Sequence, residues 1–145
     1  MPKKHLRSDQ FLVDKLNQVW SQYFSDITKS NPVHIRFGRK APKRLGSIRR
    51  CNIDNATGTF DTLILINGHY RDPSVPSYIV EATITHELCH YAHGFSSPFA
   101  QLSRFPHRGG IIDKEMQKRN LASLVNSEKK WLNSQWLKFI DKQKP

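Results

Sequence analysis

Residues 77–93 read Ser77-Tyr78-Ile79-Val80-Glu81-Ala82-Thr83-Ile84-Thr85-His86-Glu87-Leu88-Cys89-His90-Tyr91-Ala92-His93. Pro76 precedes this stretch and Gly94 follows it, and these residue types commonly begin and end helices. Apolar residues flank the ionisable ones, so we predict a helix that is buried in the core. Burying ionisable side chains costs free energy, so a glutamate between two histidines in a buried helix indicates that these groups have a function.

The segments around this helix predict a small sheet and further helices. Apolar residues recur at three- and four-residue steps between Gln10 and Ile27, which indicates an amphipathic helix. Three strands are predicted, at residues 33–37, 45–53 and 62–67. The third is an unbroken apolar run, so we expect it to be the central strand. Helical spacing returns from Ile111 onward, and the predicted class is therefore α+β.

The buried helix carries a pattern that can bind a metal ion. His86 and His90 lie one turn apart, because four residues turn an α-helix through roughly 400° and raise it about 6 Å. Glu87 lies about 100° round the helix from His86, so its carboxylate can reach a water beside the ion. Zinc suits such a site because it lowers the pKa of bound water to roughly 7. We predict one Zn²⁺ ion, with Glu87 as the general base.

A catalytic zinc site needs a third protein ligand. His93 shares a helix face with His86, but ligands stacked along one straight helix cannot converge on a tetrahedral ion. A residue from a later segment is therefore the better candidate. His107 follows a loop long enough to fold back, and it precedes Gly109-Gly110, where the backbone can approach closely. Glu115 is the alternative, because zinc sites with two His and a Glu are common.

Three stretches, together with the helix motif, resemble a known family. They are Arg44-Leu45-Gly46-Ser47-Ile48-Arg49, Leu63-Ile64-Leu65-Ile66-Asn67, and Val75-Pro76-Ser77-Tyr78-Ile79-Val80-Glu81 leading into His86-Glu87-Leu88-Cys89-His90. The chain resembles the SprT-like zinc peptidases, which include the Spartan-type proteases that cleave protein crosslinked to DNA. The resemblance runs over residues 44–121, roughly half of the chain.

The resemblance implies a zincin-like fold, in which a sheet of about three strands packs on the active-site helix between N- and C-terminal helices. It also implies that His107 is the third zinc ligand and that the protein substrates are associated with DNA. Arg108 departs from the family pattern, which usually has Gly directly after this His. A metzincin assignment is excluded, because that pattern needs Gly and His where this chain has His93 and Ser96.

Charge is distributed unevenly along the chain. The net charge is +11, yet residues 51–100 carry one Lys or Arg against five Asp or Glu. From Arg36 to Arg50 there are seven basic residues and no acidic one. This stretch is either a phosphate-binding surface or a solvated basic loop. The candidate nucleic-acid-binding residues are Arg39, Lys40, Lys43, Arg44, Arg49 and Arg50.

Composition limits the remaining possibilities. The 145 residues fit one domain, and no apolar stretch approaches the roughly 18 residues of a membrane helix. With two cysteines and no secretory signal, we expect a cytoplasmic monomer without a zinc ribbon, with association with a nucleoid or nucleus left open. The predicted activity is peptide-bond hydrolysis. A non-catalytic zinc-containing nucleic-acid-binding module and a metal-dependent hydrolase of a non-peptide amide are the alternatives.

Overall fold

The computed structural model describes residues 5–103 and 105–144. A three-stranded sheet forms one layer of the molecule. The strands are β1 (Val33–Phe37), β2 (Gly46–Cys51) and β3 (Asp61–Ile66). β3 lies in the middle, parallel to β1 and antiparallel to β2. The prediction of a central third strand is confirmed, and β2 forms one edge of the sheet.

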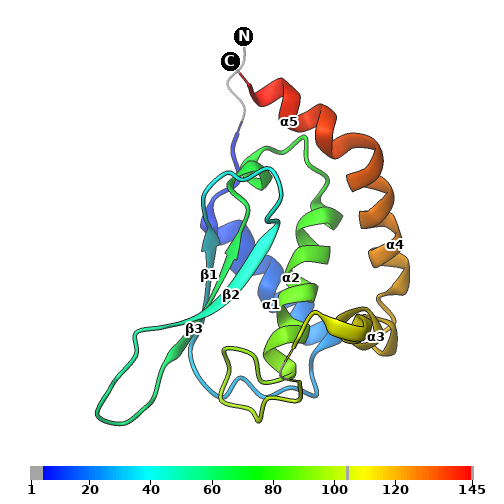
Figure 1. Ribbon diagram of the computed structural model, residues 1–145. Helices are drawn as coiled ribbons and strands as arrows, with labels where there is room; N and C mark the ends of the chain where they lie inside the picture. Colours follow the sequence, from blue (N-terminus) through cyan, green and yellow to red (C-terminus); the bar gives the residue numbers. More distant parts are fainter. Residues whose placement is uncertain (1–4, 104, 145) are drawn as a thin grey trace.

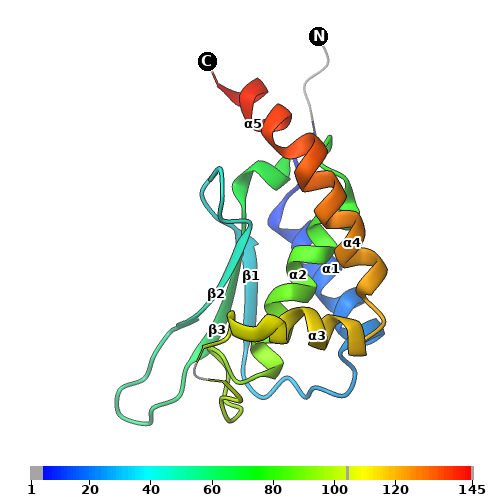
Figure 2. The same ribbon diagram turned by 45° about the vertical axis from the view of Figure 1, so that its right-hand side comes forward.

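The pleat gives this sheet one buried face and one basic face. Ile35 and Ile48 both pair with Ile64, and the three side chains are buried together. Side chains alternate along a strand, so Arg36 and Arg49 point to the other face, where both are exposed. Figure 2 shows α1, α2 and α4 on one side of the sheet. The helices therefore cover the apolar face only.

The helices form the second layer. They are α1 (Asp9–Tyr23), α2 (Ser77–Ala92), α3 (Ile111–Lys118), α4 (Ala122–Trp131) and α5 (Leu137–Gln143). A π-helical segment, η3 (Leu132–Trp136), joins α4 to α5, and Figure 1 shows the three as one continuous rod. Two short 3₁₀ turns, η1 (Gly68–Arg71) and η2 (Arg108–Gly110), complete the elements. The α+β class and the small sheet are as predicted.

Helix α2 runs through the centre of the molecule, between the sheet, α1 and α4 (Figure 1). Eleven of its sixteen residues are buried, from Ile79 to Tyr91, which explains why its sequence is apolar around most of its circumference. Gly94 follows with a φ of +83°, and a Cβ there would lie 2.3 Å from the carbonyl oxygen of Ala100. Glycine is required at this position, and the predicted end of the helix is confirmed.

The first helix is shorter than its apolar pattern predicts. α1 ends at Tyr23, so the expected extension to Ile27 is wrong. Phe24 leaves helical geometry and is buried, and the carbonyl of Ile27 accepts a hydrogen bond from Trp20 Nε1 at 2.9 Å. Tertiary packing thus continues the apolar periodicity after the helix itself has stopped. Within the described residues, no helix has the length and apolar character needed to cross a bilayer.

Candidate metal centre

Helix α2 brings the two histidines of the motif together, as their spacing predicts. The Nε2 atoms of His86 and His90 lie 3.3 Å apart, with ring centroids separated by 4.9 Å. Leu88 and Cys89, two of the three residues between them, are buried in the core. Burial raises the pKa of the Cys89 thiol to about 12, so this cysteine remains a protonated core residue.

His107 joins this pair from the loop that precedes α3. One ligand atom from each of His86, His90 and His107 can be chosen so that all three lie within 4.8 Å of one another. Gly109 and Gly110 follow with φ angles of +67° and +64°. A Cβ on either glycine would meet no atom within 4 Å, so the expected close backbone approach is wrong. These glycines instead supply the left-handed turn that folds His107 back over α2.

The three imidazoles fit a zinc ion in donor type, and the two on α2 also fit it in spacing. Burial lowers the pKa of His86, and it lowers the pKa of His90 to about 3, so both rings are neutral at neutral pH and keep a lone pair for a metal. In a tetrahedral zinc site with ordinary Zn–N bonds, two ligand nitrogens lie about 3.4 Å apart. The His86–His90 separation of 3.3 Å matches that spacing.

Glu87 lies beside the cluster and is almost fully enclosed. Its side chain is buried, and this burial raises its pKa to about 8, although Arg44 opposes the shift. The first residue of β2 covers it: a Cβ on Gly46 would lie 3.3 Å from Glu87 Oε1 and 2.6 Å from Thr83 Cγ2. Only a residue without a side chain lets the strand approach α2 this closely.

A cleft with a volume of about 600 Å³ opens over the cluster, along β2. Glu87, His90 and His107 form its floor, and Phe95 adds an apolar wall. Lys43, Arg44 and Arg49 line the same cleft, so its charge is positive apart from Glu87. An extended ligand could therefore reach both the histidines and the sheet edge.

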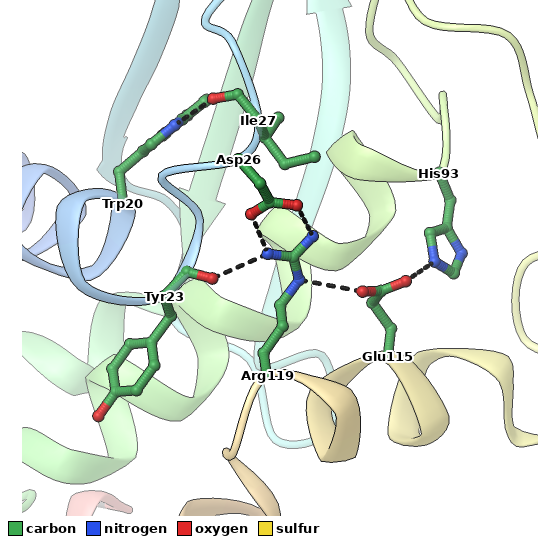
Figure 3. Close-up of polar contacts among 7 residues, drawn as sticks. All are labelled: Trp20, Tyr23, Asp26, Ile27, His93, Glu115 and Arg119. Carbon is green, nitrogen blue, oxygen red and sulfur yellow. Dashed lines mark hydrogen bonds and ion pairs between the residues drawn. The ribbon is translucent and has the colours of Figure 1, made fainter.

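Glu115, the alternative third ligand, lies outside the histidine cluster. Its Oε1 is 2.7 Å from His93 Nε2, and its Oε2 accepts a hydrogen bond from Arg119 Nε at 3.0 Å (Figure 3). Burial alone would raise the pKa of Glu115, but the hydrogen bond with His93 and the charge of Arg119 lower it. His93, which helix geometry excludes as a ligand, thus pairs with Glu115, the alternative third ligand.

Arg119 extends this network to the end of α1. Its guanidinium donates two hydrogen bonds to Asp26, at 2.6 and 3.1 Å, and one to the carbonyl of Tyr23 at 2.8 Å (Figure 3). The network therefore ties α3 to both α1 and α2. His107 lies in the loop that leads into the N-terminal end of α3, whereas these contacts are made near its C-terminal end. The pairing of Glu115 with Arg119, four residues later, is a helix spacing that sequence alone could have indicated.

The candidate nucleic-acid-binding residues separate into three groups. Arg39 and Lys40 line a hollow on the basic face of the sheet, together with Arg36. Arg44 and Arg49 line both that hollow and the metal cleft, whereas Lys43 lines the cleft alone. The guanidinium of Arg50 stacks on the ring of Phe60 at 4.4 Å, away from both cavities.

Comparisons of the chain with models of known families, with curated proteins and with solved structures found no match. The family resemblance therefore stays a prediction, and the case for function depends on the geometry of the site.

Proposed function

We propose that this chain is a zinc-dependent metallopeptidase with a zincin-like fold. One observation carries the proposal: His86, His90 and His107 offer ligand atoms within 4.8 Å of one another, next to a buried glutamate. These three histidines would hold the ion. The resemblance to SprT-like peptidases, which includes the His86–His90 motif itself, implies the same set of ligands.

The bound ion and Glu87 would each supply part of the chemistry. Zinc, when bound, would supply Lewis acidity and lower the pKa of a water in its coordination sphere to roughly 7. Glu87 accepts a proton from the attacking water and delivers it to the leaving amine. Burial raises the pKa of Glu87 to about 8 in the metal-free protein, and the charge of a bound ion would favour the ionised carboxylate that accepts this proton.

The substrate class follows from the edge of the sheet. In the described part of the chain β2 pairs only with β3, so its other edge has free backbone groups along the cleft. An extended peptide can add to such an edge as a further strand. This favours peptide bonds over a compact non-peptide amide. A purely structural zinc site is disfavoured, because structural sites are enclosed by four protein ligands, whereas His90 and His107 border an open cleft.

Glu87→Gln tests the proposal directly. We expect the variant to retain one zinc per chain, measured by elemental mass spectrometry, and to lose at least roughly 10²-fold in cleavage of an unfolded protein substrate. Glu81→Gln is the matched control, because Glu81 lies on the same helix and pairs with Lys15 at 2.7 Å. Undiminished cleavage by Glu87→Gln would refute the assigned role.

Nucleic-acid binding is a second candidate function, and it is favoured by the basic face of the sheet. A hollow of about 520 Å³ opens there, lined by five basic residues and no acidic one among the described residues: Arg36, Arg39, Lys40, Arg44 and Arg49. Such a surface attracts a phosphate backbone irrespective of sequence. Since the hollow adjoins the cleft, DNA bound there would bring associated proteins near the metal centre.

A further inference from the structure

A second, smaller cavity lies beside the metal centre, on the side of α2 that faces α4. Its volume is about 240 Å³, and it is lined by Leu45, Gly46, Thr83, His86, Glu87 and Glu128. Two of these residues, His86 and Glu87, belong to the proposed active site, so a group bound here would lie next to the reacting bond. Pockets for whole small molecules usually measure about 300–1,000 Å³, and this cavity suits one side chain of a larger substrate.

Glu128 supplies the charge of this cavity. It comes from α4, which packs against α2 (Figure 1), and it lines the cavity beside Thr83, whose hydroxyl donates a hydrogen bond to the carbonyl of Ile79. Over residues 5–103 and 105–144 Glu128 has no ion-pair partner, because the neighbouring Lys129 lies 3.6 Å from Asp113 instead. Burial raises the pKa of Glu128 to about 7, so a cation that entered the cavity would offset the cost of ionising it.

The larger cleft and the cavity beside Glu128 differ in charge, although Glu87 lines both. The larger cleft carries Lys43, Arg44 and Arg49, which disfavour a cationic side chain. The smaller cavity adds the carboxyl group of Glu128 and has no basic side chain other than His86. Charge complementarity across a binding site selects partners mainly by penalising the wrong sign. A cationic side chain next to the scissile bond is therefore directed to the smaller cavity.

We propose that Glu128 makes this site select peptides with a lysine or arginine side chain adjacent to the scissile bond. The inference rests on the proposed peptidase function. The cavity lies at the Leu45–Gly46 end of β2. A peptide added antiparallel to β2 would thus place there the residue that follows the scissile bond, and parallel addition would place the residue that precedes it.

The test uses the full-length, zinc-loaded protein and peptides of one sequence that differ at a single position. Lysine, norleucine and glutamate are placed in turn on either side of the cleaved bond, and mass spectrometry locates the cut. Norleucine has nearly the length of lysine without its charge. We expect kcat/KM to be at least roughly tenfold higher for lysine than for norleucine at one of the two positions, as for a charged hydrogen bond. Glutamate at that position should be the poorest.

Two variants assign the preference to Glu128. In Glu128→Gln the lysine-to-norleucine ratio should fall toward one, and in Glu128→Lys glutamate should become preferred to lysine. Asp141→Asn, which removes an exposed carboxylate on α5, should leave the ratio unchanged. Cleavage by the wild type without a lysine preference, or a ratio unaltered in Glu128→Gln, would overturn the inference while leaving peptidase activity intact. If zinc-loaded wild type cleaves none of the peptides, the proposed function and this inference both fail.

Discussion

The Nε2 atoms of His86 and His90 lie 3.3 Å apart, a separation that two imidazoles bound to one tetrahedral zinc ion would also have. His107 completes the set, whereas Glu115 is engaged with His93 and Arg119. We therefore expect His107→Ala to lose metal affinity by more than the roughly 10–100-fold typical of residues that only support a ligand. Glu115→Ala should lose much less.

Zinc affinity measured by competition with a chromophoric chelator checks this prediction. The wild type should bind one equivalent, and far-UV circular dichroism should verify that each variant is folded. Equal loss of zinc in both variants would mean that the third ligand has been assigned wrongly. Retention of zinc by His107→Ala would remove that histidine from the site.

Gly46→Ala should reduce peptide cleavage by roughly 10–100-fold, since displacing catalytic groups by about 1 Å has effects of this size. The new Cβ would lie 2.6 Å from Thr83 Cγ2 and 3.3 Å from Glu87 Oε1. The free energy of unfolding should fall by about 1–3 kcal/mol, as for other overpacked sites. Kinetics and urea unfolding measure the two effects separately.

Two further variants test whether the effect of Gly46→Ala comes from this contact. Gly38→Ala, whose Cβ would meet Leu65 at an ordinary 3.6 Å, should cleave like the wild type. Thr83→Ser removes the methyl group that clashes, so Gly46→Ala combined with Thr83→Ser should recover much of the lost activity. Absence of any recovery would argue against this contact as the cause.

Arg119→Met should lower both stability and zinc affinity. The guanidinium bridges Asp26 and Glu115, so its loss leaves Glu115 partly buried without one partner and loosens α3. We expect the free energy of unfolding of the zinc-free protein to fall by about 1–3 kcal/mol. Zinc affinity should fall as well, even where the variant is fully folded, because the loop carrying His107 leads into α3.

Lys15→Met is the control for Arg119, because it breaks a comparable ion pair between α1 and α2. Its effect on stability should stay below about 1 kcal/mol, and its zinc affinity should match the wild type. If both variants bind zinc like the wild type, Arg119 stabilises the fold without positioning His107.

Glu128→Gln should stabilise the zinc-free protein at alkaline pH. The pKa of Glu128 rises from an ordinary 4.5 to about 7 on folding, so the folded state binds this proton more tightly than the unfolded chain. Stability of the wild type therefore falls as the pH rises through that window. The variant should gain little at pH 4 and on the order of 1–3 kcal/mol at pH 8. Urea unfolding at both pH values, with a chelator present, measures this; an equal difference at both would contradict the assignment.

Charge reversal of Arg36, Arg39 and Lys40 should weaken DNA binding. These residues line the hollow on the sheet and not the metal cleft, unlike Lys43 and Arg44, so the change separates DNA affinity from peptide cleavage. The slope of log affinity against log salt should fall in magnitude by up to about 3. Reversal of Lys138, Lys142 and Lys144 at the C-terminal end changes net charge equally and should have a smaller effect. Unchanged affinity in the first variant would exclude this face as the DNA site.

Local patterns predicted the fold class and the central elements. The apolar run of β3, the alternation in β1 and the caps of α2 depend on short-range sequence, and the structure places these elements close to the predicted ranges. The predicted end of α1 was wrong, because Phe24 and Ile27 are apolar in order to pack in the core, although the helix has already ended. Apolar periodicity reports burial, and it does not record where the backbone hydrogen bonds stop.

The sequence by itself determined that His86, Glu87 and His90 meet on one helix, because their spacing is converted to geometry by the helix alone. Only the tertiary structure places His107 beside this pair and Glu115 away from it, since their positions depend on the left-handed turn at Gly109-Gly110 and on Arg119 reaching across from α3 to α1. The open edge of β2 and the carboxylate of Glu128 beside Glu87 likewise follow from which segments pack together. Such long-range contacts form because segments from the whole chain compete for burial and for hydrogen-bond partners. A short stretch of sequence does not show which segments will meet.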